Sequence, residues 1–248
     1  MQSGKIMQFW SAEAVGFMAD ATEYSDFYRK LTEILLPYLP KDGHICDAGC
    51  GLAALGREMS AHCAQVTAID SSEIAVTAAK SRPLPENMEI LCADLHEVEQ
   101  TFDAMIFCYF GRIGELLEIA GRMCREKVVI IKRSCAEHHF SLNKPSRSYA
   151  PDKTRETLDR LEIPCLQRHL SLEFGQPFRS VDDAVAFFRL YDHGTEPVTA
   201  ERVLPRLQPI SHPAYRYYLS ERREMELFVL DAADVRAGQK NADTAALT

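Results

Sequence analysis

Apolar runs and amphipathic stretches alternate along the middle of the chain. Strands are expected at 44–47, 65–69, 88–93, 102–107 and 127–131, and helices from about 53, at 73–80 and at 113–123. The strand segments are apolar at nearly every position, which is typical of strands buried on both faces. The pattern therefore predicts an α/β fold with a doubly wound, mostly parallel sheet.

The segments before and after this region differ from it in composition and in predicted elements. An aromatic-rich leader precedes the first strand, and helical spacing from Phe27 to Leu35 after a capping Ser25 predicts a helix that ends at Pro37. After residue 140 the pattern predicts a polar helix near 152–161, a strand over 166–174, a helix from Ser180 through Tyr191 and a last strand over 225–230.

The segment from Asp47 to Ala53 combines an acid with two closely spaced glycines. It follows a short apolar run, so it is interpreted as a buried strand that turns sharply into a helix. Gly49 and Gly51 stand where the backbone can approach a ligand closely, because they carry no side chain. The turn predicts a site for a nucleotide-like cofactor.

Three acids follow the first three apolar strands. Asp47, Asp70 and Asp94 should converge, because ligands of open parallel sheets bind beyond the carboxyl ends of the strands. A carboxylate after the second strand can accept both ribose hydroxyls, and one after the third can reach an exocyclic amine. The alternative for each acid is a helix cap or turn residue.

Composition narrows the range of partners. A formal charge of -8 disfavours nucleic acid and favours small molecules. The eight cysteines include no Cys-x-x-Cys pair and are expected to be reduced thiols of a cytoplasmic protein. The sequence has no apolar run long enough for a bilayer, so no membrane partner is predicted.

These residues resemble the motifs of class I S-adenosylmethionine-dependent methyltransferases. The glycine motif matches 47–53, with Ala53 in place of its last glycine, and Phe102-Asp103 matches the start of the family's fourth strand. The resemblance implies a seven-stranded sheet with an antiparallel last strand, and S-adenosylmethionine as cofactor. The implied cofactor-binding residues are Asp47, Gly49, Gly51, Asp70, Ser71, Asp94, Leu95, Phe107 and Cys108.

Other functions fit parts of the pattern. Residues 49–54 also satisfy a loose nicotinamide-dinucleotide fingerprint, although Asp47 would then face a pyrophosphate. An aminocarboxypropyl transferase of the same fold and a non-catalytic S-adenosylmethionine-binding protein are further alternatives to methyl transfer onto a small-molecule nucleophile.

Candidate residues for the acceptor come from several segments. Tyr109 and His139 are candidates for proton transfer, and Trp10, Tyr24, Tyr109 and Arg112 for acceptor binding. A basic excess over 112–147 is interpreted as a solvated face or, alternatively, as a site for an anionic acceptor. No metal site is predicted, because His138 and His139 are adjacent and point in different directions. Oligomeric state is left open.

The predicted organisation has four parts. They are an N-terminal helical lid (1–40), a cofactor-binding α/β core (41–140), a C-terminal part of the sheet with a substrate-site elaboration (141–234) and a flexible tail (235–248).

Overall fold

A seven-stranded sheet forms the centre of the protein. The structure is a computed structural model, which describes residues 10–134, 140–142, 153–192 and 194–246 and the side chains of these residues up to 241. The strand order of the sheet is β3-β2-β1-β4-β5-β10-β6. The strands are β1 (His44–Ala48), β2 (Gln65–Asp70), β3 (Met88–Cys92), β4 (Phe102–Cys108), β5 (Cys124–Arg133), β6 (Leu166–Glu173) and β10 (Arg222–Asp231).

Strands β1 to β5 are parallel, and β10 is antiparallel to both of its neighbours. Met225 of β10 pairs with Arg133 at the end of β5, so the start of β10 lies at the carboxyl edge of the parallel strands. The predicted doubly wound sheet and its antiparallel last strand are confirmed.

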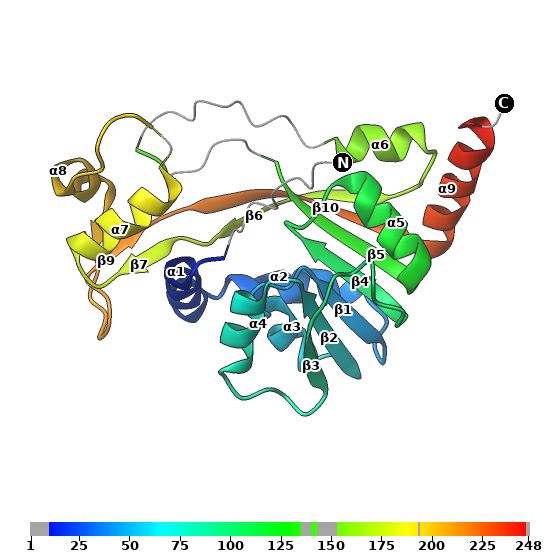
Figure 1. The fold of residues 1–248 in the computed structure, drawn as a ribbon, viewed down its shortest axis with the longest axis horizontal. Helices are drawn as coiled ribbons and strands as arrows, with labels where there is room; N and C mark the ends of the chain where they lie inside the picture. Colours follow the sequence, from blue (N-terminus) through cyan, green and yellow to red (C-terminus); the bar gives the residue numbers. More distant parts are fainter. Residues whose placement is uncertain (1–9, 135–139, 143–152, 193, 247–248) are drawn as a thin grey trace.

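Helices cover both faces of this sheet (Figure 1). One face packs against α2 (Phe27–Leu35), α3 (Ala54–Ser60) and α4 (Glu73–Lys80). The other packs against α5 (Ile113–Met123), α6 (Thr154–Arg160) and α9 (Ala232–Ala246). Burial of apolar side chains on both faces explains why the strands have no alternating pattern.

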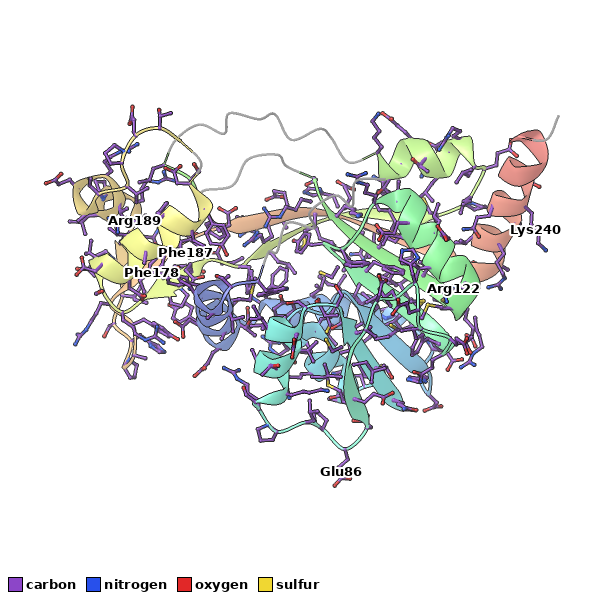
Figure 2. All side chains as sticks on the ribbon, viewed as in Figure 1. Glu86, Arg122, Phe178, Phe187, Arg189 and Lys240 are labelled. Atoms are coloured by element: carbon purple, nitrogen blue, oxygen red, sulfur yellow. The ribbon has the colours of Figure 1, made fainter. Side chains whose placement is uncertain are left out.

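Strands β6 and β10 extend beyond the parallel strands toward a smaller lobe (Figure 1). This lobe holds a second sheet, β7-β9-β8, with its own apolar cluster. Phe178 and Phe187 of that cluster are labelled in Figure 2, and their ring centroids lie 5.3 Å apart. Its elements are β7 (Gln176–Phe178), α7 (Val181–Tyr191), α8 (Ala200–Val203), η2 (Leu204–Arg206), β8 (Gln208–Pro209) and β9 (Tyr217–Leu219).

The N-terminal part contains α1 (Ala12–Tyr24), α2 and the short η1 (Leu36–Tyr38). Ser11 caps α1 by accepting a hydrogen bond from the backbone of Ala14. Phe17 of α1 packs against Phe178 and Phe187, so α1 belongs to the apolar cluster of the smaller lobe. Phe27, Leu31 and Leu35 of α2 are buried against the main sheet.

The expected flexible tail is corrected by helix α9, which continues directly from β10 to Ala246. Val235 is fully buried, and Arg236 donates a hydrogen bond to the backbone carbonyl of Cys124. A few apolar contacts on one face are enough to hold a polar helix whose composition alone resembles a loose terminus. No helix among the residues placed here is both long and apolar enough to cross a membrane.

Candidate active site

The glycine turn joins β1 to α3 in a left-handed backbone conformation. The φ angles are 71° at Gly49, 53° at Gly51 and 55° at Ala53. The N–H groups of Gly49 and Cys50 both donate to the carbonyl of Ile69 at the end of β2. The turn is therefore fixed to the second strand, and two of its three left-handed positions are glycines, which adopt this conformation without steric cost.

Two aromatic rings lie directly against the turn. A Cβ atom on Gly49 would come within 2.2 Å of the Phe110 ring, and one on Gly51 within 2.5 Å of the Trp10 ring. Phe110 also stacks on Phe107 with ring centroids 6.3 Å apart. The absence of side chains at both glycines thus makes room for flat groups against the backbone.

Asp47 lies under the turn and is almost completely buried. Its carboxylate accepts a 2.9 Å hydrogen bond from the backbone N–H of Gly56 in α3. Burial raises the pKa of Asp47 to about 7, and the nearby Asp70 carboxylate adds to the rise, whereas the Gly56 hydrogen bond opposes it. A cationic ligand group would stabilise the ionised form of this acid.

Asp70 holds two loops together at the end of β2. One carboxylate oxygen accepts from the backbone of Gly51 and the other from the backbone of Ser72, both at 2.8 Å. Ser71 lies exposed beside it. Each carboxylate oxygen has a second lone pair, so the side chain can still accept hydrogen bonds from a ligand.

Asp94 and Leu95 follow β3 and lie next to this loop. The N–H of Ala93 donates to the carbonyl of Asp70, which links the two acid-bearing loops. Asp94 accepts from the backbone of His96, and the buried Leu95 is held by a 2.6 Å hydrogen bond from Arg122 to its carbonyl. The three acids therefore lie at the carboxyl ends of three adjacent strands, at one edge of the sheet, as predicted.

Phe107 and Cys108 end β4. The Phe107 side chain is fully buried in the cluster beneath α5 and stacks against Phe110. The aromatic ring against Gly49 therefore belongs to Phe110 and not to Phe107. Burial raises the pKa of the Cys108 thiol, and the charge of Asp47 raises it further, so Cys108 faces the acid of the glycine turn.

Tyr109 has a left-handed backbone, with φ at 57°, directly after β4. Its N–H donates to the carbonyl of Ile131, and the Arg133 guanidinium lies 5.4 Å from its ring centroid. Burial is the largest cause that raises the pKa of its phenol. Tyr109 is 39% exposed by surface area, and its raised pKa keeps the phenol protonated at neutral pH, so it can donate a hydrogen bond.

The other predicted acceptor residues lie in different places. Tyr24 packs among rings of the smaller lobe, with centroid distances of 5.1 Å to Tyr218 and 5.4 Å to His212. Arg112 is exposed at the start of α5. His139 lies outside the described residues.

The basic excess over 112–147 does not form a single patch in the part of the chain that the structure covers. Arg122, visible on α5 in Figure 2, donates to the carbonyls of Leu95 and Val98. Arg125 pairs with Asp103, and Lys127 pairs with Asp231. The buried Lys132 donates to the carbonyls of Phe110 and Gly111, which fixes the loop after β4. Arg133 remains near Tyr109.

Two site residues escape the motif-based prediction. Tyr28 in α2 is partly buried, and the pKa of its phenol is raised by burial and by the charges of Cys108 and Asp47. Arg223 of β10 is 7% exposed. The sequence contains a signal for Arg223. Counting in steps of two from Arg223 gives Met225, Leu227 and Val229, so the arginine lies on the same face of the strand as these apolar residues.

Comparison with known proteins identifies the central part of the chain. A family model described as a methyltransferase domain matches residues 45–126. This part of the chain is similar to a methyltransferase domain. It includes the glycine turn and all three acids, and with the seven-stranded sheet it confirms the resemblance to the class I S-adenosylmethionine-dependent methyltransferases, whose cofactor is S-adenosylmethionine.

Solved structures agree on the fold. A provisionally named type II methyltransferase from Anaeromyxobacter dehalogenans has a TM-score of 0.53 at 14% identity, covering 82% of this chain and 96% of its own. A provisionally named methyltransferase from Bacillus halodurans has a TM-score of 0.51 at 12% identity, covering 84% and 99%. Among curated proteins, no sequence matches this chain.

The residues of the methyltransferase domain fit this cofactor. The buried acid Asp47 suits an ammonium group, and Asp70 suits a ribose. A Cβ atom at Gly49 or Gly51 would occupy the side of the turn against which a ligand could otherwise lie. In this structure the rings of Phe110 and Trp10 cover that side, so a cofactor held against both glycines would have to displace them.

Proposed function

We propose that the protein transfers the methyl group of S-adenosylmethionine to a small-molecule nucleophile at the carboxyl edge of its sheet. The observation that carries this is that Asp47, Asp70 and the glycine turn lie together at the ends of β1 and β2, with Tyr109 directly after the neighbouring strand β4. The free thiols at the seven described cysteines support a cytoplasmic location.

In this proposal, each of three loops binds a different part of the cofactor. Asp47 holds the ammonium end, Gly49 and Gly51 receive the methionine part, and Asp70 binds the ribose. Asp94 and Leu95 contact the adenine. The cofactor supplies an electrophilic methyl group on a sulfonium.

Positioning is the main task of the remaining residues. Methyl transfer is an in-line displacement, so a nucleophile held in near-attack geometry and shielded from water gains most of the available acceleration. Tyr109 is fixed by its hydrogen bond to Ile131 and by Arg133, and it orients the acceptor as a donor. A proton that must leave the acceptor goes to another group; His139 is our candidate.

A small acceptor fits the charge of the molecule better than a nucleic acid does. The net charge is -8, and three of the cations near the domain are already engaged in ion pairs or backbone hydrogen bonds (Arg122, Arg125 and Lys127). Sequence-independent nucleic-acid binding instead needs several cations free to contact phosphates.

The test supplies methyl-labelled S-adenosylmethionine together with the filtered small-molecule fraction of a cell extract. We expect label in small molecules, with S-adenosylhomocysteine as the by-product, and much less label with Asp70→Asn. Methylthioadenosine as the by-product would indicate aminocarboxypropyl transfer instead. Binding of S-adenosylhomocysteine without any label transfer would favour the non-catalytic alternative, and label found only in macromolecules would contradict a small acceptor.

A further inference from the structure

Arg223 is a buried cation without a matching anion among the described residues. It is 7% exposed, and its buried Nε atom has no hydrogen-bond partner in the part of the chain that the structure describes. No ion pair between described residues includes it. A buried guanidinium normally has its donors satisfied, because an unpartnered buried charge is costly. Such an arginine is typical of a site that a ligand completes.

Aromatic rings hold this guanidinium in place. Its carbon lies 4.9 Å from the ring centroid of Phe140 and 5.5 Å from that of Phe174. The two rings belong to the separate apolar clusters of the smaller lobe and the main sheet, so Arg223 lies where these clusters meet. Cation–π contacts orient a planar guanidinium but accept none of its N–H groups in the plane.

A second positive charge close to Arg223 strengthens the attraction of this region for an anion. Arg133, on the neighbouring strand β5, repels it and helps burial to lower its pKa. Glu221, Tyr109 and Tyr28 act in the opposite direction, but Glu221 forms no ion pair with it, and both phenols are neutral because their own pKa values are raised. Burial raises the pKa of Tyr191 in α7, and the charges of Arg223 and Arg133 oppose that rise.

This group of side chains lies beside the methyl-transfer edge. Met225, two residues after Arg223, pairs with Arg133, and Arg133 covers the ring of Tyr109 after β4. The charge of Arg223 also acts on Cys108, the residue that faces Asp47. The cation is therefore on the β4–β5–β10 side of the edge, and β4 and β5 lie between its strand and β1.

We propose that the methyl acceptor carries a carboxylate, and that Arg223 binds it side-on through Nε and a terminal nitrogen, with Arg133 and Tyr109 as neighbours. A guanidinium fork matches the two oxygens of a carboxylate. This inference rests on the proposed function, since it places the acceptor at the same sheet edge. It assigns acceptor recognition to Arg223 in place of Arg112.

Calorimetry on protein saturated with S-adenosylhomocysteine tests the assignment. The probes are benzoate and hexanoate, their neutral counterpart benzamide, and phenyl phosphate. We expect at least one carboxylate to bind saturably and at least tenfold more tightly than benzamide. Arg223→Met should weaken that binding tenfold or more, and Arg223→Lys should weaken it less, because it keeps the charge but loses the fork.

Arg222→Met is the matched control. Arg222 is the exposed neighbour on β10, and its guanidinium donates to the hydroxyl and the carbonyl of Ser171, so its loss should leave carboxylate binding unchanged. S-adenosylhomocysteine should bind Arg223→Met as it binds the unaltered protein, which also shows that the variant is folded.

The outcomes separate the two proposals. Failure of the unaltered protein to bind S-adenosylhomocysteine would contradict the proposed function. Normal S-adenosylhomocysteine binding would overturn the carboxylate assignment alone if neither carboxylate binds, if only phenyl phosphate binds, or if Arg223→Met and Arg223→Lys bind carboxylate as well as the unaltered protein does.

Discussion

The carboxylate of Asp70 accepts a 2.8 Å hydrogen bond from the backbone N–H of Gly51 in the glycine turn. Its other oxygen accepts from Ser72 at the start of α4, so one side chain ties the loop after β1 to the loop after β2. The acid that is expected to bind the ribose therefore also shapes the turn that is expected to receive the methionine part. Cofactor binding at the two loops should be coupled through this carboxylate.

Asp70→Asn tests this coupling. An amide offers one acceptor oxygen, so one of the two backbone N–H groups would face an NH₂ group, and a ribose would lose a charged partner. We expect the affinity for S-adenosylhomocysteine, measured by calorimetry, to fall at least tenfold, in line with the loss of about 1.5–3 kcal/mol for a hydrogen bond to a charged group.

Asp103→Asn provides the control for Asp70→Asn. Asp103 also accepts a 2.8 Å backbone hydrogen bond, from His44, but it lies at the start of β4 and so at the opposite edge of the sheet. Its substitution should change stability without changing S-adenosylhomocysteine affinity. Equal losses of affinity in both variants would show that the effect of Asp70 is only structural.

Gly49→Ala should damage the turn itself. A left-handed backbone costs a non-glycine residue about 1–2 kcal/mol, and the new Cβ would also push the Phe110 ring out of its stack with Phe107. We expect a lower free energy of unfolding in urea and weaker S-adenosylhomocysteine binding.

Gly16→Ala is the matched change in α1, where nothing lies within 4 Å of the added Cβ. It should stabilise the protein by roughly 0.5–1 kcal/mol, because alanine is the better helix former. A Gly49→Ala variant as stable as the Gly16→Ala variant would contradict the strained turn.

The sequence was sufficient to predict the central sheet, because its strands are apolar at most positions and alternate with amphipathic helical segments. The predicted helices 73–80 and 113–123 have the observed bounds of α4 and α5. The positions of Asp47, Asp70 and Asp94 follow from the same logic, since each lies at or just beyond the carboxyl end of a parallel strand.

Features that depend on tertiary contacts could not be predicted in this way. Strands β7, β8 and β9 have two or three residues each, too few for a periodic signal. Helix α9 is held by burial of Val235 against a partner far away in the sequence. The contact of Phe110 with Gly49 depends on a left-handed Tyr109, and the environment of Arg223 depends on Phe140 and Phe174, which come from two different loops.

Trp10 should report cofactor binding directly. It is the single tryptophan of the chain, and its ring packs against Gly51, where the methionine part of the cofactor is expected. Titration with S-adenosylhomocysteine should therefore change the intensity or wavelength of tryptophan emission, with a midpoint that matches calorimetry. Trp10→Phe should lose the signal but still bind. Unchanged emission at calorimetric saturation would place the ligand away from this ring.

Asp47 should make stability depend on pH. Burial raises its pKa from 3.8 to about 7, so the folded state holds a proton that the unfolded state has already released at intermediate pH. The stability associated with this proton is complete below pH 4 and is lost as the pH rises to about 7. Asp47→Asn does not titrate, so its free energy of unfolding, relative to that of the unaltered protein, should increase over this range.

Cofactor binding should show the opposite trend with pH. The ionised Asp47 attracts an ammonium group, so the affinity for S-adenosylhomocysteine should rise as the pH increases from 6 to 8 in the unaltered protein, because the acid then no longer has to release a proton on binding. The Asn variant should bind more weakly at pH 8 and show a flatter profile. Parallel profiles for the two proteins would assign the pH dependence to another group and remove Asp47 from the ammonium site.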